Sequence, residues 1–202
     1  MDRIIAKELL SIGAVFLRPE EPFTWASGIK SPIYCDNRLT LSAPSVRQKI
    51  EAGLAGIVMK QYPECEMLMG TSTAGIAHAA ITASILGLPM GYVRGEAKSH
   101  GRGNRIEGRM EKGAKVVVIE DLISTGGSAI EVVEALREEG AEVLGIASIF
   151  TYGIRRGLDR IAAAHTVNYS LSNLDTLVEV AVEEGYIAPE WKSKIIEFRD
   201  SL

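Results

Sequence analysis

The chain has 202 residues, 47% of them hydrophobic, and its 22 lysines and arginines against 26 aspartates and glutamates give a formal net charge of −4. This composition can bury the core of one domain and gives no reason to expect bulk binding of nucleic acid. Its two cysteines, Cys35 and Cys65, form no Cys-x-x-Cys pair, which argues against a zinc site or a disulfide framework and favours a reducing cytoplasm.

The first forty residues are expected to combine one helix with short β pieces. Residues 3–10 have helical character, whereas prolines at 19, 22 and 32 and a glycine at 28 interrupt residues 14–34. Such interruptions favour short strands, which we interpret as an irregular hood over the main sheet. No signal peptide is expected, and the largely apolar run at 79–93 contains two glycines and a proline and is too short to span a bilayer, so no membrane segment is expected either.

From residue 45 onward the sequence alternates between helical and strand patterns. Helical spacing covers 45–61, 76–86, 128–139, 174–184 and 189–201, and apolar strand-like runs cover 67–69, 90–94, 116–119, 143–150 and 166–169. This alternation predicts an α/β fold with a doubly wound, mainly parallel sheet flanked by helices and a small irregular N-terminal hood. We expect a single domain over 1–202, with the hood at about 1–40.

Residues 115–128 carry the pattern around which the chain is organised. Val116 to Ile119 has the apolar character of a buried parallel strand, and Glu120 and Asp121 follow it, where ligands bind in open α/β sheets. The small, hydroxyl-rich run Ser124-Thr-Gly-Gly-Ser128 then precedes a helical pattern, which is typical of a phosphate-binding loop. Ser128 and Glu131 have capping-box spacing. The alternative is an ordinary strand-turn-helix with solvated acids.

These two halves of the motif together indicate one kind of ligand. The loop favours an anion, whereas the paired acids repel one, so the ligand should carry a phosphate at one end and hydroxyls or a bound cation at the other. A ribose 5-phosphate with Mg²⁺ has these properties. The chain contains no Gly-x-x-x-x-Gly-Lys-Ser/Thr sequence, which excludes the P-loop.

A second run of small residues and a basic loop extend the candidate site. Gly70 to Gly75 also lies between a predicted strand and a helix. Residues 92–108 contain four glycines and many donors, and Arg94, Lys98 and His100 are suited to bind a pyrophosphate. We expect a mobile active-site loop over about 95–109; the alternative is a merely solvated basic loop. Residues 94–115 have seven basic and three acidic side chains, leaving −8 on the rest, which suits a small anionic substrate.

The run from Glu120 to Ser128 resembles the phosphoribosyl-pyrophosphate (PRPP) signature of the type I phosphoribosyltransferases. The segment Phe23-Thr-Trp-Ala-Ser-Gly-Ile-Lys-Ser-Pro32 and the loop at 94–100 resemble the orotate phosphoribosyltransferases of that family, and the resemblance covers most of the chain. It implies PRPP binding by Arg94, Lys98, His100, Glu120, Asp121, Leu122, Ile123, Ser124, Thr125, Gly126, Gly127 and Ser128. It implies orotate contacts from Tyr34, Cys35 and Ser124, and catalytic roles for Arg94, Lys98, His100 and Asp121.

The resemblance also implies the reaction. Ribose 5-phosphate passes from PRPP to N1 of orotate, giving orotidine 5-monophosphate and pyrophosphate in the formation of pyrimidine nucleotides. Mg²⁺ is expected to be carried on PRPP near Glu120 and Asp121 rather than held directly by the protein. A homodimer with active sites shared across its interface is implied, with no nucleic-acid or membrane partner.

This chain departs from the family pattern at several positions. Gly95, Ala26 and Ala74 stand where family members place basic residues, and Thr151-Tyr-Gly153 occupies the region from which an arginine usually reaches orotate. Three alternatives remain open from the sequence: a purine or uracil phosphoribosyltransferase, a non-catalytic PRPP-sensing regulator that binds nucleic acid, and a plain nucleotide-binding α/β domain.

Overall fold

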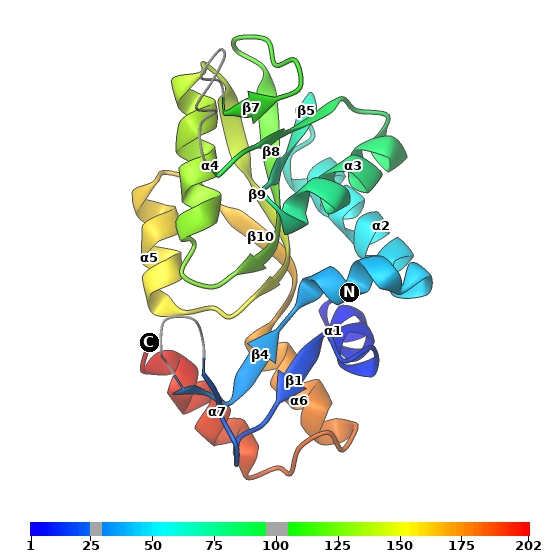
Figure 1. The fold of residues 1–202 in the computed structure, drawn as a ribbon, viewed down its shortest axis with the longest axis vertical. Helices are drawn as coiled ribbons and strands as arrows, with labels where there is room; N and C mark the ends of the chain where they lie inside the picture. The colour runs from blue at the N-terminus through cyan, green and yellow to red at the C-terminus, as the bar shows by residue number, and fades with distance from the viewer. Residues whose placement is uncertain (25–29, 96–104) are drawn as a thin grey trace.

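The computed structural model describes residues 1–24, 30–95 and 105–202. A six-stranded sheet runs through its centre in the order β10-β9-β8-β5-β6-β7 (Figure 1). All neighbouring strands are parallel except β6 and β7, which are antiparallel. The strands are β5 (Met67–Thr71), β6 (Met90–Val93), β7 (Ile106–Glu107), β8 (Lys115–Ile123), β9 (Glu142–Thr151) and β10 (Asn168–Asn173). The predicted α/β fold with a mainly parallel sheet is confirmed.

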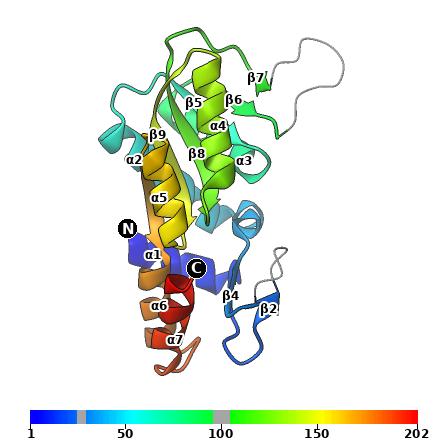
Figure 2. The same ribbon diagram turned by 90° about the vertical axis from the view of Figure 1, so that its left-hand side faces the viewer.

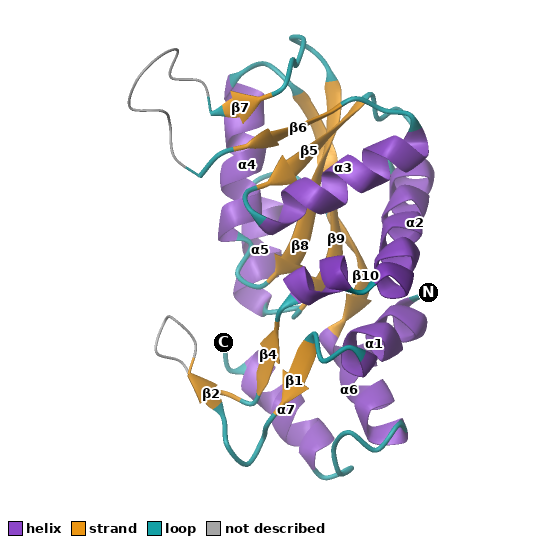
Figure 3. Cartoon of the chain, turned by 45° about the vertical axis from the view of Figure 1, so that its right-hand side comes forward, coloured by secondary structure: helices purple, strands orange, loops and turns teal. Residues whose placement is uncertain are grey.

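Helices cover both faces of this sheet because its central strand is apolar on both sides. In β8, Val117 and Ile119 belong to one core cluster, and Val116 and Val118 belong to the other. The first cluster packs under α2 (Pro44–Gln61) and α3 (Ala74–Leu86), and the second packs under α4 (Gly127–Glu138) and α5 (Arg155–Ala163). Figure 3 shows the sheet between these two pairs of helices.

The predicted hood is a pair of small antiparallel sheets. Strand β1 (Val15–Leu17) pairs with β4 (Ile33–Cys35), and β2 (Phe23–Thr24) pairs with β3 (Lys30–Ser31). The short helix η1 (Asn37–Ser42) then leads into α2. The rings of Phe16, Phe23 and Tyr34 contact one another across these strands.

Both ends of the chain contribute to this part of the molecule. Helix α1 (Asp2–Ser11) contacts α6 (Leu174–Glu183), and the salt bridge between Arg3 and Glu183 joins them. Helix α7 (Trp191–Asp200) packs beside α6. Figure 2 shows β4 and β2 below the carboxyl end of β8, with α6 and α7 at the same end of the molecule. Among the described residues, no helix is long and apolar enough to cross a membrane.

The structure differs from the sequence-based expectations in four places. Helix α5 was not expected, and β7 was not expected as a separate antiparallel strand. Strand β8 continues to Ile123, so Glu120 and Asp121 lie within it rather than after it. The predicted capping box is wrong, because the N-cap of α4 is Gly126 and no side chain caps this helix.

Candidate active site

The candidate site lies at the carboxyl ends of two neighbouring strands, β5 and β8, whose following helices lie on opposite faces of the sheet. Neighbouring strands β5 and β8 are parallel, and the helices that follow them, α3 and α4, pack on opposite faces. The loops after the two strands therefore diverge and leave a crevice at their carboxyl ends, where α/β sheets bind ligands. A cavity of about 370 Å³ occupies this position.

Glu120 lies almost completely buried at the floor of the crevice, with 5% of its surface exposed. Its Oε1 accepts hydrogen bonds from the hydroxyl of Thr71 at 2.8 Å and the backbone N–H of Asp121 at 2.9 Å. Its Oε2 accepts a longer bond of 3.3 Å from the hydroxyl of Ser128. Burial, followed by the neighbouring Asp121 carboxyl, raises the pKa of Glu120 to about 8. Both causes favour the protonated form of this carboxyl in the free site.

Asp121 is linked to the hood through its backbone. The side chain of Asn37, which is 1% exposed, donates a 2.6 Å hydrogen bond from Nδ2 to the carbonyl oxygen of Asp121. Asn37 Oδ1 in turn accepts from the thiol of Cys35 at 3.2 Å. Burial, with Asp121 and Asp36 nearby, raises the pKa of Cys35 well above its usual range, so this thiol stays neutral. The hood thus has a fixed position relative to the end of β8.

The loop after β5 packs directly against β8. A Cβ atom on Gly75 would lie 2.4 Å from the carbonyl oxygen of Ile119 and 2.4 Å from Oγ1 of Thr71, so only glycine fits here. The hydroxyl of Ser72 donates a 2.6 Å bond to the carbonyl oxygen of Val93 on the neighbouring strand β6. These contacts hold the start of α3 against the acidic end of β8.

The loop at 124–128 turns from β8 into α4 through a glycine in the left-handed conformation. Gly126 has a φ of +72° and forms the N-cap of α4, where backbone N–H groups are left without helical partners. Helix α5 supports this loop from behind, because a Cβ on Gly157 would lie 2.4 Å from the carbonyl oxygen of Ser124. Arg160 also donates a 3.3 Å hydrogen bond from Nη1 to the carbonyl oxygen of Thr125.

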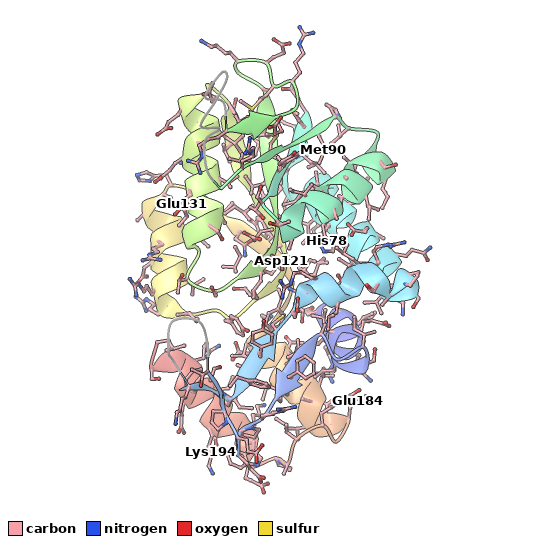
Figure 4. The ribbon with its side chains drawn as sticks, in the orientation of Figure 1. His78, Met90, Asp121, Glu131, Glu184 and Lys194 are labelled. Atoms are coloured by element: carbon pink, nitrogen blue, oxygen red, sulfur yellow. The ribbon has the colours of Figure 1, made fainter. Side chains whose placement is uncertain are left out.

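The cavity brings together part of the predicted site. Its lining includes five predicted residues: Cys35, Glu120, Asp121, Leu122 and Ser128. Figure 4 shows Asp121 near the centre of the molecule. Tyr34 is 38% exposed on the neighbouring hood strand, and Ser124, Thr125, Gly126 and Gly127 form the adjoining loop. Ile123 is buried in the core, so its side chain faces away from any ligand.

Of the three residues predicted to bind pyrophosphate, Arg94 is the one that the structure describes. It follows β6, and its Nη1 lies 3.6 Å from a carboxylate oxygen of Glu107 on β7. Its backbone N–H bonds to the carbonyl oxygen of Arg105, so the two arms of the loop are paired at their base. Lys98 and His100 lie outside the described residues, as does the segment 25–29 of the hood.

Sequence reasoning missed several residues of this site. Asp36, Arg38, Ser72, Thr73 and Ala74 also line the cavity. Asp36 and Arg38 follow the segment Phe23 to Pro32 that carries the family resemblance. Ser72, Thr73 and Ala74 lie in the run from Gly70 to Gly75, which the sequence had placed in the candidate site without a role for each residue. Thr71 lies in the same run, but no sequence pattern could indicate its hydrogen bond to Glu120, 49 positions away.

The carboxyl oxygens in the crevice suit a magnesium ion that is bound mainly by substrate phosphates and waters. Among the described residues, no group of three or more histidine, cysteine, aspartate or glutamate side chains could hold a metal. Mg²⁺ commonly binds through one or two carboxylates together with substrate phosphates and waters. The carboxyls of Glu120 and Asp121 fit that arrangement.

A larger cavity of about 420 Å³ lies elsewhere, between the tip of the hood and the connection from α6 to α7. Its lining residues include Arg18, Glu20, Tyr186 and Trp191, and it contains none of the side chains described above. The smaller cavity at the end of β8 is therefore the better candidate, because it combines the buried carboxyl of Glu120 with two strand-to-helix loops.

Comparison with known proteins places the chain in a family. Residues 41–183 match the model of the phosphoribosyl transferase domain. The chain is 60% identical to an orotate phosphoribosyltransferase of Bacillus cytotoxicus over 199 residues, covering 98% of this chain and 95% of that protein. An orotate phosphoribosyltransferase of Bacillus anthracis is 59% identical over the same shares.

Solved structures of similar fold agree with this assignment. Orotate phosphoribosyltransferase from Aeropyrum pernix matches with a TM-score of 0.79 and 30% identity over 91% of this chain and 99% of its own. UMP synthase from Leishmania donovani matches with a TM-score of 0.85 and 25% identity, covering 99% of this chain and 42% of that longer protein. With its α/β sheet, its two strand-to-helix loops and these relatives, the chain belongs to the orotate phosphoribosyltransferase family.

Proposed function

We propose that the chain transfers the ribose 5-phosphate of PRPP to N1 of orotate, releasing pyrophosphate and forming orotidine 5-monophosphate for pyrimidine nucleotide synthesis. The observation that carries this proposal is the position of Glu120 and Asp121. The two acids line a cavity between the hood and the loop that opens α4. A sugar phosphate has hydroxyls for the acids and an anion for the loop.

The substrate would lie across the crevice in three parts. Backbone N–H groups of residues 124–128 and the hydroxyls of Ser124, Thr125 and Ser128 would bind the 5-phosphate. The carboxyls of Glu120 and Asp121 would accept hydrogen bonds from the ribose hydroxyls. The base would then extend toward Ser124, Tyr34 and Cys35, beneath the hood.

The reaction breaks the bond between the anomeric carbon and pyrophosphate and forms a bond from that carbon to N1 of orotate. Positive charge develops on the sugar, and Asp121 would stabilise it electrostatically. Negative charge develops on the leaving pyrophosphate, and Arg94, Lys98 and His100 would stabilise it through charge-assisted hydrogen bonds. Bound Mg²⁺ would supply further neutralisation of the phosphate charge.

Three further properties belong to this proposal. Mg²⁺ acts as the cofactor and arrives on PRPP near Glu120 and Asp121. The chain works as a homodimer whose active sites are shared across the interface, so an active monomer at working concentration would contradict the proposal. A cytoplasmic location is supported by Cys35 and Cys65, which are both free thiols.

The proposed activity is tested by measuring pyrophosphate release from PRPP and Mg²⁺ with orotate, uracil, adenine and hypoxanthine offered separately. Each assay needs a control without base, because slow hydrolysis of PRPP also releases pyrophosphate. We expect release above this control with orotate alone. Release with a purine or with uracil would refute the assignment of the base, and tight PRPP binding without turnover would indicate a regulator.

A further inference from the structure

The cavity at the end of β8 contains more acidic than basic side chains. Asp36, Glu120 and Asp121 line it, and Arg38 is the one cation among the described lining residues. Both substrates of the proposed function are anions, since orotate carries a carboxylate and PRPP carries phosphates. Any anionic group that reaches the hood side of the cavity therefore meets Arg38 as its cationic partner among these residues.

We propose that Arg38 is a substrate-binding residue that holds an oxyanion from the hood side of the cavity. The oxyanion is the carboxylate of orotate or the diphosphate of PRPP, because both offer paired oxygens to a guanidinium. This inference rests on the proposed function and adds to it a residue for which neither the sequence motifs nor the catalytic scheme supplied a role.

Arg38 is already oriented by a bidentate contact with Asp36. Its Nε donates to Oδ1 of Asp36 at 2.6 Å, and its Nη2 donates to Oδ2 at 2.8 Å. The Arg38 side chain holds the pKa of the Asp36 carboxyl below its usual range, so the carboxylate stays charged. A guanidinium has five N–H groups. This contact uses one edge of the group, and the edge formed by Nη1 and the second Nη2 hydrogen has no partner among the described residues.

The backbone that carries Arg38 is fixed to the sugar-binding strand. Its neighbour Asn37 is buried and donates to the carbonyl oxygen of Asp121 at 2.6 Å. Thr40 closes the first turn of η1 by donating its hydroxyl to the carbonyl oxygen of Asn37 at 2.5 Å. The side chain of Arg38 is itself 64% exposed, so a ligand in the cavity can reach it. Arg38 therefore combines an accessible charge with a rigid support.

Two arginines near the end of β9 are engaged elsewhere. Nε of Arg155 donates to both carboxylate oxygens of Asp159 within α5, at 3.0 and 3.2 Å. Arg199, whose Nη1 lies near Gly153, is bonded to Asp175 and Asp200. Neither arginine lines the cavity at the end of β8. Arg38 therefore has the better position for a substrate anion.

The test compares Arg38→Ala and Arg38→Lys with wild type. Calorimetry measures the binding of PRPP and of pyrophosphate with Mg²⁺, and steady-state kinetics at saturating PRPP give KM and kcat for orotate. The matched control is Arg3→Ala, which also removes a partly exposed, salt-bridged arginine but lies on α1. Because Arg38 is exposed, both variants are expected to fold, and a thermal melt checks this.

A carboxylate contact predicts that Arg38→Ala raises the KM for orotate about tenfold or more while the binding of PRPP and of pyrophosphate stays unchanged. A diphosphate contact predicts a similar loss in PRPP and pyrophosphate binding, with the KM for orotate unchanged at saturating PRPP. In either case Arg38→Lys recovers only part of the loss, because lysine keeps the positive charge but cannot donate two parallel hydrogen bonds to paired oxygens.

If Arg38→Ala leaves PRPP binding and the KM for orotate both within about twofold of wild type, the inference is wrong. A loss of equal size in Arg3→Ala would also overturn it, because the effect would then come from stability. Wild-type protein that binds PRPP without turning over orotate would refute the proposed function instead, and the binding measurements would still decide the role of Arg38.

Discussion

Replacing Glu120 with glutamine tests whether the buried carboxyl holds a proton in the free protein. Burial first, and then the Asp121 carboxyl, raise the pKa of Glu120 to about 8, whereas an unfolded glutamate titrates near its ordinary value of about 4.3. Between these values the folded chain keeps a proton that the unfolded chain loses. Stability from this group is therefore complete below about pH 4.3 and declines as the pH rises through about 8.

The expected size follows from proton linkage. One proton changes the free energy of unfolding by at most about 1.4 kcal/mol per pH unit, so on the order of 3 kcal/mol is lost between pH 5 and pH 7. Glutamine resembles the protonated acid: its oxygen can accept from Thr71 and from the backbone of Asp121, and its amide can donate to the Asp121 carboxylate. Glu120→Gln should therefore remove this decline.

The assay is urea unfolding of wild type and Glu120→Gln at pH 5, 6, 7 and 8, without PRPP or Mg²⁺. The quantity to compare is the difference in unfolding free energy between the two proteins, because titration of all other groups then largely cancels. Glu131→Gln is the matched control, since Glu131 is exposed on α4 and should follow wild type. Parallel curves for wild type and Glu120→Gln would show that Glu120 is ionised in the free protein and would refute the reasoning.

Further predictions follow from the loops and the metal. Gly75→Ala should destabilise the fold by about 2 to 3 kcal/mol and weaken PRPP binding, because its Cβ would meet the carbonyl of Ile119, whereas Gly56→Ala, on an open face of α2, should leave both intact or raise stability slightly. Equal melting temperatures for the two would contradict this. Chelation by EDTA should stop turnover without lowering the melting temperature of the free protein. Lys98→Ala should lower kcat more than about tenfold with an unchanged melt, and near-normal turnover would remove its catalytic role.

The sequence was sufficient to predict the parallel strands of the central sheet because their signals are local. The apolar run from Val116 to Ile119 is buried on both faces, and glycines permit the turns of the two strand-to-helix loops. Helix α5 lacked such a signal, since it has nine residues and just two of them, Gly157 and Ile161, are buried. Its role also depends on a close approach of Gly157 to the loop at 124–128, which no local pattern reports.

The sequence predicted which residue types form the candidate site, but it did not predict which residues are hydrogen-bonded to one another. Ser128 and Glu131 have the spacing of a capping box, yet the Ser128 hydroxyl bonds to Glu120, eight residues earlier. The long-range partner replaced the local one because β8 ends directly beside the start of α4. Likewise the bond from Asn37 to Asp121 joins residues 84 positions apart, and periodicity carries no information about such pairs. Tertiary contacts therefore decide which polar residues of a recognised motif face the ligand.

The charges of the crevice also favour an order of substrate binding. Before any ligand binds, Glu120 keeps its proton, so the charged side chains among the described lining residues are Asp36 and Asp121 against Arg38. The excess of one negative charge repels the orotate anion. PRPP that arrives with Mg²⁺ brings a cation to the carboxyls, and this cation lowers the pKa of Glu120 and releases its proton. PRPP should therefore bind first and release close to one proton at pH 7, which calorimetry in buffers of different ionisation enthalpy would measure. Binding without proton release would mean that Glu120 is already ionised in the free protein or stays protonated beside the ribose, and the order would then need another cause.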